Sequence, residues 1–142
     1  VALVEPGWSI GIDAELSDRG IASNAFDMMA KGDELLWLQK NPEQAIYLWT
    51  SKESVQKAMQ MGMHLNPRNI EIPIGVGVVN ISIENSKIQL QNWAFLGYQV
   101  ALAWRQGSVE LRTPEDDLLD STKKAMSEQD WGIGCKTSRG NA

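Results

Sequence analysis

Residues 74–112 alternate short apolar runs with polar or glycine-containing steps. The stretch is rich in β-branched and aromatic residues, a pattern typical of an antiparallel meander. With a hairpin loop at Asn85-Ser86, Ile83 is expected opposite Ile88, so that apolar residues share one face. We therefore predict a four-stranded meander over residues 74–112.

The connections of this meander are predicted from its faces. A two-residue loop after the second strand would bury glutamine amides without partners, so we expect a three-residue loop at Leu96-Gly97-Tyr98, followed by a hairpin loop at Gln106-Gly107. One face of the sheet is then apolar and needs a cover. Its expected residues are Val79, Ile81, Ile83, Ile88, Leu90, Val100, Leu102, Trp104, Val109 and Leu111.

The same register also gathers apolar residues on the face that should meet solvent. They are Val76, Val78, Trp93, Phe95 and Ala101. A covering helix, loop or N-terminal strand is the simplest explanation, and a surface for a partner or ligand is the alternative. We take these five as the candidate binding residues.

Further elements are predicted on the N-terminal side of the meander. Apolar residues at positions 8, 10, 12 and 14 alternate with small and acidic ones, which predicts a half-buried strand near residues 8–15. Residues 45–49 favour a strand by propensity, and Thr50-Ser51-Lys52-Glu53 has the pattern of a capping box that starts a new helix. With helical patterns at 21–39 and 113–128, the fold class is α+β: a mainly antiparallel sheet with helices packed on one face.

Composition limits the alternatives. A chain of 142 residues predicts a single domain, which we place at residues 1–131 with a flexible tail at 132–142. The net charge of −5 and the absence of a Lys/Arg cluster argue against nucleic acid as a partner. No apolar run approaches the ~18 residues of a membrane span. The cytoplasm is the default location, and a secreted or periplasmic location would follow if the missing N-terminal Met reflects signal-peptide removal.

The candidate chemical groups are few. His64 is the single histidine, and we interpret it as a bystander near a helix end. Cys135 is the single cysteine and lies in the glycine-rich tail. Asp13, Glu15 and Asp18 have oxygen ligands for a hard cation, but the spacing of a calcium loop is absent, which favours a solvated strand face. No metal, cofactor or catalytic residue is predicted.

These features favour a binding protein over an enzyme. We predict a small non-catalytic interaction protein that forms a homodimer through the face of Trp93, or that acts as an accessory to another protein. A second interpretation is a small-molecule-binding protein, with a pocket lined by Trp37, Trp49 or Trp93 that takes a small apolar or cationic ligand. A third is an enzyme centred on His64, with Asp13 or Glu15 as its partner.

Overall fold

The computed structural model describes residues 4–107 and residue 122. Contacts divide the chain into two compact units, Val1–Ser108 and Val109–Ala142, and the elements below belong to the first. Its strands are β1 (Trp8–Leu16), β2 (Val78–Ile83), β3 (Ser86–Phe95) and β4 (Tyr98–Gln106). Its helices are α1 (Phe26–Met29), α2 (Gly32–Lys40) and α3 (Ala45–Met59), and short 3-10 turns cover Ser23–Ala25, Pro42–Gln44, Gly62–His64 and Pro67–Asn69.

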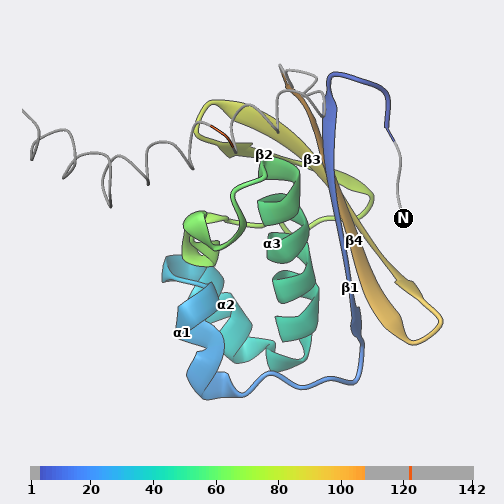
Figure 1. Cartoon of the computed structure of the whole chain (residues 1–142). Coiled ribbons are helices and arrows are strands. Elements are labelled where there is room, and N and C mark those ends of the chain that lie inside the picture. The colour runs from blue at the N-terminus through green and yellow to red at the C-terminus, as the bar shows by residue number, and fades with distance from the viewer. Residues whose placement is uncertain (1–3, 108–121, 123–142) are drawn as a thin grey trace, which may run out of the picture. The chain divides into compact units, whose positions relative to one another are not determined.

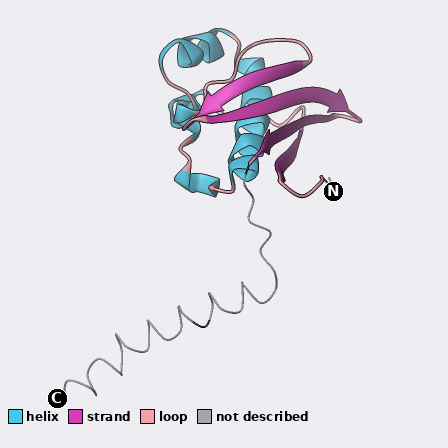
Figure 2. Ribbon diagram, turned by 90° about the horizontal axis from the view of Figure 1, so that it is seen from above, coloured by secondary structure: helices cyan, strands magenta, loops and turns pink. Residues whose placement is uncertain are grey.

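The four strands form one antiparallel sheet in the order β1-β4-β3-β2. Helix α3 lies along one face of this sheet, and α1 and α2 lie on the far side of α3 (Figures 1 and 2). The predicted fold class, an α+β domain with a mainly antiparallel sheet and helices on one face, is confirmed.

Helix α3 approaches β1 and β4 closely because the strands present small residues to it. A Cβ atom built on Gly11 would lie 2.0 Å from the carbonyl oxygen of Ser54, so only glycine fits there. Ala101 and Ala103 of β4 are fully buried on the same face. The sheet therefore holds the backbone of α3 at a fixed position, which matters for the side chains that α3 presents.

The main core fills the space between this face, α3 and the two shorter helices. Its larger members are Phe26, Met29, Leu38, Leu48, Val55, Ile70, Ile81, Ile88 and Leu90. Three of them, Ile81, Ile88 and Leu90, belong to the predicted apolar face of the meander, and they are buried as expected together with Ile83.

The predicted faces of β1 and β4 are inverted in the structure. Ser9 and Gly11 are buried toward α3, whereas Ile12 and Leu16 are exposed on the opposite face. In β4 the two alanines face α3, so Leu102 and Trp104 lie on the outer face and are only partly buried. Size explains the inversion, because a helix backbone in contact with a strand excludes large side chains.

Both of these predicted hairpin registers are wrong, the first by two residues in its pairing and the second by one. The first turn is Glu84-Asn85, and Ile81 pairs with Ile88 while Ile83 pairs with Ser86. The second turn is Leu96-Gly97, because Phe95 pairs with Tyr98. All four turn residues have positive φ, as two-residue type I′ turns require.

The predicted strand at residues 45–49 is also wrong. These residues form the first turns of α3, which runs without a break through Thr50-Ser51-Lys52-Glu53 to Met59. Gln60 ends the helix in the left-handed conformation. Strand propensity is a weak guide here because α3 is buried on several sides, and burial favours the same apolar residues in either conformation.

Several predictions fall on residues that the structure does not describe. They are the last meander strand at 109–112, the helix at 113–128, Cys135 and the tail at 132–142. The domain limits of 1–131 and 132–142 therefore stay a prediction. Among the described residues, no helix is long and apolar enough to span a bilayer.

Candidate active site

Helix α3 and strand β1 bring four charged side chains together. Asp13 and Glu15 alternate along β1 and face the same side of the sheet as α3. Glu53 and Lys57 are four residues apart on α3 and therefore lie on one side of that helix. The Lys57 ammonium donates to Oδ1 of Asp13 at 2.8 Å and to the carbonyl oxygen of Ile12 at 3.2 Å.

The second carboxylate oxygen of Asp13 has no partner. The Asp13 side chain is only 11 % exposed, and its Oδ2 is buried without a hydrogen bond within the described residues. Buried polar atoms are nearly always paired in native proteins, so an unpaired one points to a missing ligand. An anionic oxygen in this position is ready to accept a cation or a donor.

Glu53 lies in a negatively charged environment. Partial burial raises the pKa of its carboxyl group, the charges of Asp13 and Glu15 raise it further, and Lys57 opposes the shift. No hydrogen bond to the Glu53 carboxylate occurs within residues 4–107. Three carboxylates thus lie near the Lys57 ammonium and the Arg19 guanidinium, and the remaining excess of negative charge favours a bound cation.

The donor set suits a hard divalent cation only in part. In the described part of the chain, no three His, Cys, Asp or Glu side chains converge into a complete metal site. Mg²⁺, however, is usually held by one or two carboxylates together with waters and substrate phosphates. Asp13 and Glu53 fit such a cation, provided that a phosphate ligand supplies the remaining oxygens.

An apolar cavity lies beside this acidic cluster. Its volume is about 230 Å³, and its lining is Arg19, Ile21, Ala25, Met28, Met29 and Trp49. Arg19 donates to Glu15 at 2.6 Å, and Trp49 precedes Glu53 by one turn of α3. The cavity therefore adjoins the charged side chains at two points.

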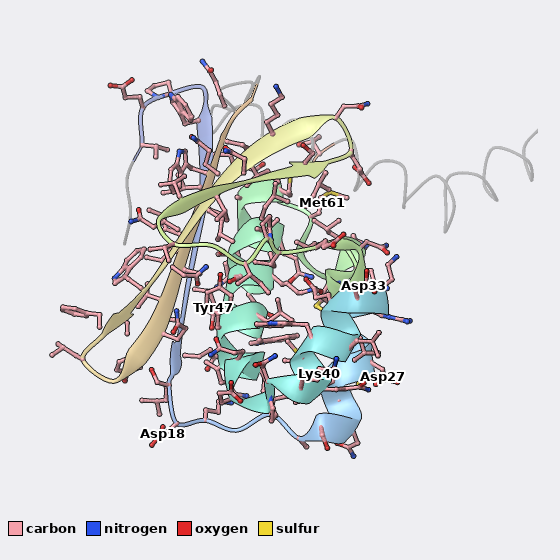
Figure 3. The ribbon with its side chains drawn as sticks, turned by 180° about the vertical axis from the view of Figure 1, so that it is seen from behind. Asp18, Asp27, Asp33, Lys40, Tyr47 and Met61 are labelled. Carbon is pink, nitrogen blue, oxygen red and sulfur yellow. The ribbon has the colours of Figure 1, made fainter. Side chains whose placement is uncertain are left out.

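The predicted binding residues lie elsewhere. Val76, Val78, Trp93 and Phe95 are exposed, with Val76 at 104 % of its reference exposure, whereas Ala101 is fully buried under α3 and does not belong to their surface. Val76 and Trp93 line a separate cavity of about 270 Å³ together with Tyr47, Gly75, Gly77, Val79, Asn92, Ala94 and Gln99. Tyr47, a residue of α3 (Figure 3), lines this cavity, and burial raises the pKa of its phenol. Whether these residues bind a partner stays a prediction.

The other candidates do not form a site. His64 is exposed in its 3-10 turn and has no carboxylate partner among the described residues, so it is not paired with Asp13 or Glu15. Asp18 is exposed beyond the end of β1 (Figure 3). Trp37 packs against the core, while Trp49 and Trp93 line different cavities.

The sequence pattern did not identify Glu53 and Lys57 as site residues, and it predicted a solvated strand face for Asp13. Glu53 was interpreted as a capping residue, although α3 begins eight residues earlier. The signal that was available is the small-residue spacing of Ser51, Ser54 and Ala58, all fully buried, which marks the side of a helix that packs closely. A strand containing Ser9 and Gly11 on one face is its natural partner, and that pairing would have placed Asp13 beside α3.

Comparison with known proteins gives one result. The family model of the 4′-phosphopantetheinyl transferase superfamily matches residues 9–106, which include α3 and the whole sheet except Trp8. No curated protein and no solved structure matches the chain significantly. The family consists of enzymes, so the predicted non-catalytic binding protein is wrong. Its members act on carrier proteins, and a protein partner is therefore retained from the prediction.

Proposed function

Since this chain belongs to the 4′-phosphopantetheinyl transferase superfamily, we propose that it transfers a phosphopantetheinyl group to a carrier protein at the Asp13–Glu53 cluster. Coenzyme A carries this group on a diphosphate and is the proposed donor. The observation that supports the location is the unpaired, buried Oδ2 of Asp13 beside the electrostatically disfavoured carboxylate of Glu53. Phosphoryl transfer needs such a cluster, because cations must neutralise the charge of the diphosphate.

The proposed reaction is a displacement at phosphorus. A hydroxyl oxygen of the carrier protein forms a bond to the phosphorus of the phosphopantetheinyl group. The bond between that phosphorus and the bridging oxygen breaks, and adenosine 3′,5′-bisphosphate leaves with the electron pair. The hydroxyl proton passes to solvent, to which the cluster opens on the side of the half-exposed Lys57.

Each side chain of the cluster has a separate proposed role. Asp13 and Glu53 would hold a divalent cation through their carboxylate oxygens. When bound, the cation neutralises the diphosphate and makes its phosphorus more electrophilic. Lys57 extends from α3 beside both carboxylates and binds phosphate as a point charge. Glu15, held by Arg19, adds to the negative potential that attracts the cation.

The apolar cavity next to the cluster is the proposed docking site of the carrier protein. It combines the exposed Met28 and the guanidinium group of Arg19 with apolar walls. This combination suits a helix with apolar and acidic residues, and it would place the carrier hydroxyl close to Glu53. Replacement of the exposed Met28 by Glu should raise the KM for the carrier protein with little change in kcat, whereas Met63→Glu, equally exposed elsewhere, should not. Equal KM values for the two variants would contradict this docking site.

The finer partner predictions remain separate proposals. A homodimer, or a small apolar or cationic ligand, would use the exposed surface of Val76, Val78, Trp93 and Phe95. The solution mass of the wild-type chain and of Trp93→Ala tests self-association, because a monomer in both cases rules out a dimer through this surface.

The location of the site is tested by the cation dependence of coenzyme A binding. Calorimetry should give tight binding to the wild-type chain with Mg²⁺ and at least tenfold weaker binding without it, since a cation held by Asp13 and Glu53 would neutralise the charge of the diphosphate. Asp13→Asn should abolish the effect of Mg²⁺. Asp18→Asn is the matched control, because Asp18 is exposed and outside the cluster. Cation-dependent binding that survives Asp13→Asn would contradict the assignment.

A further inference from the structure

The ammonium group of Lys57 lies where a cation at Asp13 would find its ligands. It contacts a carboxylate oxygen of Asp13 and the backbone carbonyl oxygen of Ile12. Carboxylate and carbonyl oxygens are the ligands that hard divalent cations take in proteins. No other acceptor for this ammonium occurs among the described residues.

The Lys57 side chain is held less firmly than that of a buried lysine. It is 49 % exposed and is attached to α3 by a flexible four-carbon stem. Lys52, five residues earlier on the same helix, differs in burial and in hydrogen bonding. It is fully buried, and its ammonium donates to Glu34 and to the carbonyl oxygens of Pro67 and Ile70. Within residues 4–107, the ammonium of Lys57 is held only by its contacts to β1.

An ammonium and a divalent cation cannot share the carboxylate of Asp13 without cost. Two positive charges within a few ångströms of each other repel, and a doubly charged ion repels the ammonium more strongly than a singly charged one. A bound cation therefore displaces Lys57, or Lys57 weakens the cation. The displaced ammonium is attracted by the phosphates that arrive with the donor.

We propose that Lys57 is a built-in competitor of the cation: it occupies Asp13 in the cation-free protein and moves to the donor phosphates when cation and donor bind together. The inference rests on the proposed function and adds an order of events to it. It implies that the protein alone binds a divalent cation weakly, and that the donor strengthens cation binding by removing the competing ammonium.

Mn²⁺ titration followed by electron paramagnetic resonance tests this proposal. Without coenzyme A, Lys57→Met should bind Mn²⁺ roughly fivefold more tightly than the wild-type chain, as expected for removal of a partly exposed ion pair. With coenzyme A present, the same variant should lose most of the strengthening that the donor gives to the wild type. Lys57→Arg keeps the charge and should bind Mn²⁺ as weakly as the wild type. Lys40→Met, at the exposed end of α2, is the control for total charge (Figure 3).

The outcomes separate this inference from the proposed function. Unchanged or weaker Mn²⁺ binding by Lys57→Met, or tight binding by Lys57→Arg, overturns the competitor role and leaves the site intact. Absence of Mn²⁺ binding by all variants, with and without coenzyme A, overturns both proposals. A thermal melt of each variant ensures that only folded protein is compared.

Discussion

Lys52 and Glu53 are neighbours in the sequence of α3, yet their surroundings are opposite. The Lys52 ammonium is fully buried, and its three donors meet the Glu34 carboxylate and the carbonyl oxygens of Pro67 and Ile70. Glu53 is half-buried beside two other carboxylates and accepts no hydrogen bond from the described residues. The cluster around Lys52 is complete, because its polar groups find their partners inside the protein, whereas the cluster around Glu53 leaves Oδ2 of Asp13 without one among the described residues.

The complete cluster is structural. Glu34 also accepts a hydrogen bond from the backbone N–H of Ile72 at 2.8 Å, so the ion pair ties α2 and α3 to the segment that leads into the sheet. Burial lowers the pKa of Lys52, and the hydrogen bond and charge of Glu34 oppose this shift. Buried polar groups with all their hydrogen bonds made inside the protein stabilise the fold, whereas a buried polar group without a partner indicates where a ligand binds.

The largest expected effect is the loss of the complete cluster. Lys52→Met should destabilise the protein by about 3–5 kcal/mol, because the Glu34 carboxylate and two carbonyl groups would remain buried without a donor. Urea unfolding measures this effect. The exposed Lys40→Met should change the free energy of unfolding by less than about 0.5 kcal/mol.

A second substitution sharpens this test. Added to Lys52→Met, Glu34→Gln removes the carboxylate charge that the first substitution leaves unpaired, and it keeps an acceptor for the N–H of Ile72. The double variant should therefore recover part of the stability lost in Lys52→Met. If Lys52→Met alone costs no more than Lys40→Met, the cluster is not structural and the contrast with Glu53 fails.

The smallest expected effect has the opposite sign. Glu53→Gln should stabilise the cation-free protein at neutral pH by no more than a few tenths of a kcal/mol, because it removes a disfavoured charge that solvent partly screens. A raised pKa means that the folded state holds its proton more tightly than the unfolded chain. Stability from this group is therefore present at low pH and is lost as the pH rises through the folded pKa.

The gain from Glu53→Gln should accordingly disappear below about pH 4, where the glutamate is protonated in both states. Thermal melts across a pH series measure the difference from the wild type. Glu43→Gln, at an exposed glutamate outside the cluster, should show no such dependence. A gain that persists unchanged at acid pH would show that charge is not its cause.

Much of the fold followed from the sequence, and the exceptions have one physical cause. Periodicity located β1 and the meander strands, but it did not indicate which face would meet a helix. Hydrophobicity favoured the face of Ile12, Leu102 and Trp104, whereas close helix packing selected the face of Gly11 and Ala101. The choice depends on the distance between two backbones, which local patterns do not contain.

The candidate site was missed for the same reason. Asp13 faces α3 only because β1 is oriented by Gly11, and Glu53 became visible as a site residue only when α3 was seen to begin at Ala45. Residues 13 and 53 are distant in the chain, and their proximity depends on both corrections. The exposed surface of Val76, Val78, Trp93 and Phe95 was located from the pattern, but exposure alone assigns it no function.

The most direct measurement is the intact mass of a carrier protein after incubation with coenzyme A, Mg²⁺ and this chain. The account predicts a gain equal to one phosphopantetheinyl group with the wild-type chain, and no gain with a folded Asp13→Asn/Glu53→Gln double variant. Transfer that is undiminished in the double variant, or no transfer by the wild type to any carrier protein offered, would contradict it.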